Sequence, residues 1–217
     1  MKLAHIHKRI EPIWHVQLAI ILAIAAQVLL SKEFVVGPRY ALAAVEFVLL
    51  MAISLPGNSR QRPSHRLLRR LLALVLLSLI AITNIASLVL ISDALLNGSA
   101  TNGHVLIYSA LVIYATNVIV FGLFYWELDN RSLEGTIDGE RDFLFPQQSS
   151  SAEATHQAGW QPTFFDYLYV SVTNATAFSP TDAMPLTYRA KLLMTVQAFT
   201  SLATIALVAA RAVNILK

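Results

Sequence analysis

Long runs of apolar residues alternate with short polar or turn-forming segments along this chain. Five such runs cover residues 13–30, 40–55, 71–91, 104–126 and 186–215. Most of them approach or exceed the roughly 20 apolar residues that an α-helix needs to cross a bilayer. The pattern therefore predicts an all-α integral membrane protein with five firm transmembrane helices.

A further stretch, residues 163–191, differs because aromatic, hydroxyl, amide, Pro and Asp residues crowd together in it. Residues 164–178 predict a helix, one stripe of which is formed by Phe165, Tyr169, Val172 and Thr176. Pro180 prevents this helix from continuing, so the chain must break at 179–182. A broken backbone at membrane depth is tolerated only where it is buried in protein or lines water. The segment 163–179 is therefore expected to be a pore-loop-like element or a sixth spanning helix.

The residues of this stretch resemble the pore loop of the tetrameric potassium-channel superfamily. That family has a pore helix, the filter Thr-Thr-Val-Gly-Tyr-Gly-Asp, and then x-x-Pro-x-Thr-x-x-Gly-Lys at the start of the inner helix. Six residue types match at fixed spacing over about the last quarter of the chain: Tyr169, Thr176, Asp182, Pro185, Thr187 and Lys191. The resemblance implies a pore loop followed by an inner helix, in a homo-oligomer that would be a tetramer.

The filter itself departs from the family pattern. The resemblance implies pore-lining or filter-like roles for Thr176, Phe178, Ser179, Pro180, Thr181 and Asp182. Both filter glycines are replaced, by Ser179 and Thr181, and Pro180 stands in place of the Tyr. Potassium selectivity needs backbone carbonyls that point into the pore, which Gly permits. A potassium-selective filter is therefore not expected. The whole chain, including Asp142 to Pro146, also resembles a widespread bacterial family of multi-pass membrane proteins of unknown function.

Composition supports the membrane class. Hydrophobic residues make up 56% of the chain and charged residues 13%, against about 25% charged in soluble domains. Three regions are expected: a four-helix transmembrane region over 1–127, an acidic soluble loop over 128–161, and a channel-like pore loop with the last transmembrane helix over 162–217. The absence of Cys excludes disulfides and thiol chemistry.

Two polar or apolar patterns leave alternatives open. The apolar run 143–146 inside the acidic loop is expected to dock either on the membrane surface or on the body of the protein. The last helix has a polar side, which predicts either a pore-facing or a tightly packed helix. Its members are Thr195, Gln197, Thr200, Ser201 and Thr204.

Glu46 is an ionisable residue in the middle of the second apolar run. Charged residues at the centre of a membrane helix cost roughly 2.5 to 3.5 kcal/mol on insertion scales, so Glu46 must face protein, water or a cation. It is therefore either an ion or proton site, or a neutral carboxyl group hydrogen-bonded to Ser, Thr or Asn on a neighbouring helix.

The distribution of Lys and Arg predicts the orientation. With the N-terminus inside, residues 1–12, 57–70 and 128–161 hold three, five and two Lys or Arg, against Lys32 and Arg39 on the other side. The positive-inside rule then places the loop before Thr163 in the cytoplasm, whereas a potassium-channel pore loop starts outside. The segment 163–179 either spans, re-enters from the cytoplasm as an inverted pore loop, or breaks the rule. Six spans with both termini inside satisfy the charges most simply.

Three functions follow from these patterns. The first is a membrane pore or channel-like protein of the bacterial inner membrane, which would act on monovalent cations. The second is a small proton-coupled transporter that uses Glu46, and the third is a membrane protein with a structural role. An enzyme is not expected, because no catalytic, phosphate-binding or metal motif is present. Neither a cofactor nor a nucleic-acid partner is expected, and the lipid bilayer is the expected surrounding.

Overall fold

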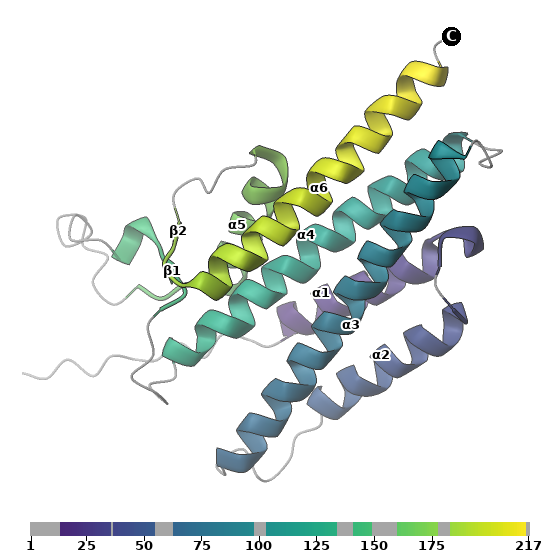
Figure 1. Ribbon diagram of the computed structural model, residues 1–217. Helices are drawn as coiled ribbons and strands as arrows, with labels where there is room; N and C mark the ends of the chain where they lie inside the picture. Colours follow the sequence, from purple (N-terminus) through teal and green to yellow (C-terminus); the bar gives the residue numbers. More distant parts are fainter. Residues whose placement is uncertain are drawn as a thin grey trace, which may run out of the picture.

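The computed structural model is built almost entirely of helices (Figure 1). It describes residues 14–35, 37–54, 63–97, 103–133, 141–148, 160–177 and 183–215. The α-helices are α1 (Trp14–Leu29), α2 (Arg39–Ser54), α3 (Pro63–Leu96), α4 (Gly103–Leu133), α5 (Phe164–Ala177) and α6 (Tyr188–Ile215). Two 3-10 turns, η1 (Lys32–Phe34) and η2 (Pro146–Gln148), and two short strands, β1 (Phe143–Leu144) and β2 (Met184–Pro185), complete the described part.

The helix boundaries follow from Pro and Gly residues. Gly37 has a φ of 78° in the turn between α1 and α2, a backbone conformation that Gly adopts at little cost. The carbonyl of Pro38 then accepts the first hydrogen bonds of α2, from the backbone N–H groups of Ala41 and Leu42. Pro63 begins α3, where its missing N–H would have no partner inside the helix anyway.

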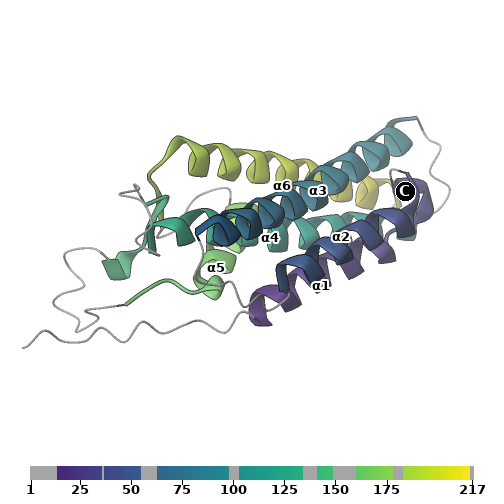
Figure 2. The ribbon, with the colours of Figure 1, turned by 90° about the horizontal axis from the view of Figure 1, so that it is seen from below.

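Helix α4 is the centre of the arrangement. It packs against α1, α3, α5 and α6, and α3, α4 and α6 are long rods that lie side by side with α4 antiparallel to the other two (Figure 1). The hairpin of α1 and α2 lies on the side of α4 that is opposite to α6 (Figure 2). Apolar side chains of α1 to α4, among them Ala23, Leu76 and Ile80, form the main core.

Three helices among the described residues are long and apolar enough to cross a membrane. They cover Leu67–Leu96, Gly103–Asp129 and Tyr188–Arg211, and they support the prediction of a helical membrane protein. Helices α1 and α2 are apolar but have 16 residues each, which is about 24 Å of helix against a hydrocarbon core of about 30 Å. Five spans are therefore not confirmed, although all five predicted helices are present.

Candidate functional site

The segment that resembles a pore loop begins at the end of α4. Helix α5 has 14 residues, which is about 21 Å of helix. Tyr167 in its first turns is fully buried, and its hydroxyl donates a hydrogen bond of 2.5 Å to Asp129 Oδ2 near the C-terminal end of α4. His15 at the start of α1 also lies there, with its ring centroid 5.2 Å from that of Phe165.

From this point α5 runs along α4 towards the middle of the bundle. Gly122 allows the two helices to approach closely, because a Cβ atom at this position would lie 3.2 Å from Leu168 Cα. One turn further, Ser171 Oγ donates a hydrogen bond of 2.6 Å to the carbonyl of Val118. Val118 is near the middle of the apolar part of α4, which covers Gly103–Asp129. Helix α5 therefore reaches about half-way along α4.

The chain then returns to the end of α4 from which α5 started. Strand β2 follows α5 and pairs antiparallel with β1, with Phe143 opposite Pro185 and Leu144 opposite Met184. The backbone N–H of Asp142, immediately before β1, donates to Asp129 Oδ1 at 2.7 Å. Both ends of the α5 segment thus lie beside Asp129, at what we call the Asp142 end of the bundle (Figure 1). A helix that crosses the bundle would end at the opposite end, whereas both ends of this segment lie at the Asp142 end, so this geometry favours the re-entrant alternative over a sixth span.

Asp142 holds the start of α6 at this end. Its carboxylate is fully buried and accepts hydrogen bonds at Oδ1 from Thr187 Oγ1 and, at 2.7 Å, from Arg189 Nε. Its backbone carbonyl accepts the N–H of Leu186 at 2.9 Å. Thr187 Oγ1 in turn accepts the N–H of Ala190 at 3.3 Å, in the first turn of α6. One buried carboxylate therefore fixes the point at which the returning chain becomes the last helix.

An aromatic cluster fills the space around Asp142. Phe143 is fully buried and Phe145 is 5% exposed. They pack against Tyr125, Tyr167 and Trp160, with ring centroids 5.1 to 6.0 Å apart. The apolar run 143–146 thus docks on the body of the protein, which decides between the two locations that its sequence left open.

A buried polar network connects α5 to both long helices beside it. Gln197 of α6 is fully buried, and its Oε1 accepts hydrogen bonds from Tyr125 of α4 at 2.5 Å and from Asn174 of α5 at 2.8 Å. Its Nε2 donates to the carbonyl and the hydroxyl of Ser171 at 3.0 and 2.6 Å. Asn117 of α4 donates to Ser201 at 2.9 Å. These contacts join the middle of α4, α5 and α6.

The polar side of α6 is therefore packed inside the chain. Gln197, Thr200, Ser201 and Thr204 are all buried, and Thr195 is the one predicted member that is exposed. Of the two alternatives for this helix, the tightly packed one is correct for the four buried residues.

The filter-like residues begin where α5 ends. Thr176 lies in the last turn of α5, is exposed, and donates to the carbonyl of Val172 of its own helix at 2.9 Å. Phe178, Ser179, Pro180, Thr181 and Asp182 lie outside the described residues. The predicted stripe on α5 is confirmed as one exposed face, which consists of Phe165, Tyr169, Val172 and Thr176.

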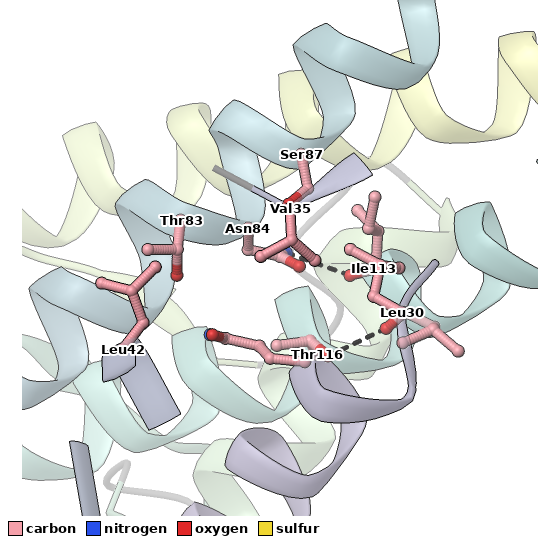
Figure 3. A pocket seen from close by; sticks show the side chains of 10 residues that line it. Leu30, Val35, Leu42, Thr83, Asn84, Ser87, Ile113 and Thr116 are labelled. Carbon is pink, nitrogen blue, oxygen red and sulfur yellow. Dashed lines mark hydrogen bonds between the residues drawn. The ribbon is translucent and has the colours of Figure 1, made fainter. Parts of the chain in front are cut away.

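Glu46 lies on the other side of the bundle. It is fully buried in α2, and neither carboxyl oxygen has a hydrogen-bond partner. The Gln27 side chain of α1 is the polar group next to it, but it does not meet the geometry of a hydrogen bond. Gln27 also lines a cavity of about 20 Å³ between α1, α2, α3 and α4 (Figure 3). The hydrogen bond to Ser, Thr or Asn that a neutral Glu46 was expected to make is absent from the described part of the chain.

The described residues contain no group of three His, Asp or Glu that could hold a metal ion. The sequence pattern placed Gln197 on the polar side of the last helix but did not reveal its partners, and it did not reveal Asp129 or Arg189 as members of the site. Each of them acts through a partner at least 23 residues away in the chain, and the pattern of a single helix does not report such pairs.

The fold and these contacts define the chain as a helical protein with three described helices that are long and apolar enough to cross a membrane, and with a half-length helix packed against two of them. No family model, curated protein or solved structure matches this chain, so its function has to be argued from its own residues.

Proposed function

We propose that this protein is a channel-like, multi-pass protein of the bacterial inner membrane, in which α4, α5 and α6 form a pore module. The observation that carries the proposal is the half-length helix α5, which starts and returns at the Asp142 end between two long helices. A non-helical backbone at membrane depth is stable only inside protein or beside water. Placing such a segment beside a polar, water-filled pore meets that requirement.

The residues after α5 would line the mouth of this pore. Thr176 is the last side chain of the exposed α5 stripe, and the filter-like residues 178–182 follow it directly. Asp182 would attract monovalent cations. Without the two filter glycines, the mouth would discriminate poorly among them.

A pore of this kind needs several copies of the chain. The polar residues of α6 are used inside one chain, whereas the exposed surface of α5 carries Phe165, Tyr169 and Val172. Copies related by a rotation axis beside α5 would bury these apolar side chains and bring their Thr176 residues together. We therefore propose a homo-oligomer, with a tetramer as the resemblance implies.

The charges support entry of the α5 hairpin from the cytoplasm. Arg70 of α3 lies 4.0 Å from Glu127 of α4, near the Asp142 end, and Arg189 and Lys191 begin α6 at the same end. This places Arg189 and Lys191 on the side that the positive-inside rule assigns to the cytoplasm. Arg211 and Lys217 near the end of the chain would lie on the other side, so the support comes from the basic loops before α5. The module would be an inverted pore loop, with five crossings and the end of α6 outside.

The test is cation flux through liposomes that contain the purified full-length protein. Because the chain has no Cys, Thr176→Cys places a single thiol at the proposed mouth. A cationic, water-soluble thiol reagent should reduce the flux of this variant by more than half. The reagent should leave the cation flux of the Ile82→Cys variant unchanged, since Ile82 is an exposed apolar residue on α3, away from α5.

Asp182→Asn should also reduce cation flux relative to anion flux. Absence of flux from the wild-type protein would refute the pore, as would equal inhibition of the two Cys variants.

A further inference from the structure

The fully buried carboxyl group of Glu46 has no partner that balances its charge. It lies in the interior of α2, and both carboxyl oxygens lack a hydrogen bond. A bare carboxylate in such a place costs several kcal/mol, so it must bind a proton or another cation.

No basic side chain of the described residues supplies that cation. Helix α2 packs against α1 and α3. The described part of α1 has His15 as its one ionisable group. The pairing of Gln17 Nε2 with Ser54 Oγ at 2.9 Å places His15 near the far end of α2, about two turns from Glu46. Helix α3 has no ionisable residue between Arg70 and Asp93.

Oxygen-bearing side chains line a cavity beside Gln27, the polar neighbour of this carboxyl group. The cavity beside Gln27 is lined by polar side chains from α3 and α4, which are Thr83, Asn84, Ser87 and Thr116 (Figure 3). Leu42, one helical turn before Glu46, forms its wall on the side of α2. A cavity of about 20 Å³ has room for about one water molecule, and therefore for one small ion.

The side chains around the cavity keep acceptor oxygens free. Asn84 Nδ2 donates a hydrogen bond to the carbonyl of Ile113 at 3.1 Å, so its amide oxygen remains as the group that can bind a cation. Thr83 and Thr116 use their hydroxyl protons on carbonyls of their own helices, which leaves their oxygen lone pairs available. Hydroxyl, amide and carboxylate oxygens are the ligands that hard cations prefer.

We propose that Glu46, Gln27 and this cavity form a binding site for one small monovalent cation, Na⁺ or a proton, inside the α1–α4 bundle. The site is separate from the α5 hairpin, and its test does not depend on the pore. Its ligand neutralises Glu46 and so stabilises the contact of α2 with α1 and α3.

The experiment measures the melting temperature of the purified full-length protein in detergent at constant ionic strength. At pH 8.5, Na⁺ replaces Cs⁺, which is too large for a cavity that holds about one water molecule. If Na⁺ is the ligand, each tenfold increase above its Kd should raise the melting temperature by about 3 to 6 °C, and acid pH should weaken this response. If the ligand is a proton, the melting temperature should rise as the pH falls from 8.5 to 5.5, without a Na⁺ response.

Three variants make the result specific. Glu46→Gln imitates the neutral carboxyl group and should remove the Na⁺ response and the acid response alike. Glu33→Gln, which removes an exposed carboxylate on η1, should keep them. Ser87→Ala should weaken a Na⁺ response of the melting temperature several-fold. It should keep the acid response, because Glu46 is still present. The proposal is overturned if wild type and Glu46→Gln respond identically to Na⁺ and to pH.

Discussion

Replacement of Gln197 by Leu should release α5 from its two neighbouring helices. The substitution keeps the approximate size of the side chain but removes four hydrogen bonds, to Tyr125, to Asn174 and twice to Ser171. Hydrogen bonds between membrane helices average about 0.6 kcal/mol, with a maximum near 1.7, while those in soluble proteins contribute about 1 kcal/mol. Four bonds therefore predict a loss of about 2 to 4 kcal/mol in the free energy of unfolding.

The assay is reversible unfolding of the purified protein in mixed micelles by increasing the mole fraction of SDS. Thr195→Val is the matched control, because Thr195 lies on the same helix, is exposed, and donates only to the carbonyl of Lys191 one turn earlier. The control should lose less than about 0.5 kcal/mol. A loss below about 1 kcal/mol for Gln197→Leu, or one no larger than that of the control, would refute the role of Gln197 as the anchor of α5.

Three further predictions address the same hairpin. Gly122→Leu should lower the free energy of unfolding by about 1 to 3 kcal/mol, because a side chain there meets the backbone of α5 at Leu168; unchanged SDS unfolding would contradict the close approach. Asp142→Asn should lower it by about 1 to 2 kcal/mol in the same assay, since it weakens the contact with the half-exposed Arg189, and a neutral effect would rule out that carboxylate as a latch. Single Cys residues at Gln161 and Met184, both exposed, should react with an impermeant maleimide from the same side of the membrane, opposite to Asn97→Cys; labelling from opposite sides would mean that α5 spans.

The sequence predicts the parts of this fold that depend on local pattern. The stripe of α5 from Phe165 to Thr176 repeats at helical spacing, and it forms one exposed face. The turn before α2 could be predicted from the sequence because a Gly-Pro pair such as Gly37 and Pro38 is a strong local signal for a turn. Such features need only neighbouring residues, so a single sequence contains them.

The return of the chain after α5 could not be deduced in this way. It depends on Asp142 meeting Arg189 and Thr187, which lie 47 and 45 residues further along the chain. The excess of Lys and Arg on one side pointed instead to six spans, because charge counts do not distinguish a hairpin from a crossing. The return of the chain before α6 had one signal in the sequence. It was the pair Pro185 and Thr187, which match the potassium-channel pattern.

The contacts of α5 join it to partners on both sides of it in the chain. At its inner end, Asn174 donates hydrogen bonds to Gln197 and, at 2.9 Å, to the carbonyl of Met194. Strand β1 pairs with Met184 and Pro185. All of these partners follow α5 in the chain and are therefore synthesised after it. Until α6 is made, the hydrogen bonds that hold α5 come from α4, through Asp129 and Val118, and the contacts of its inner end form only when α6 packs beside it.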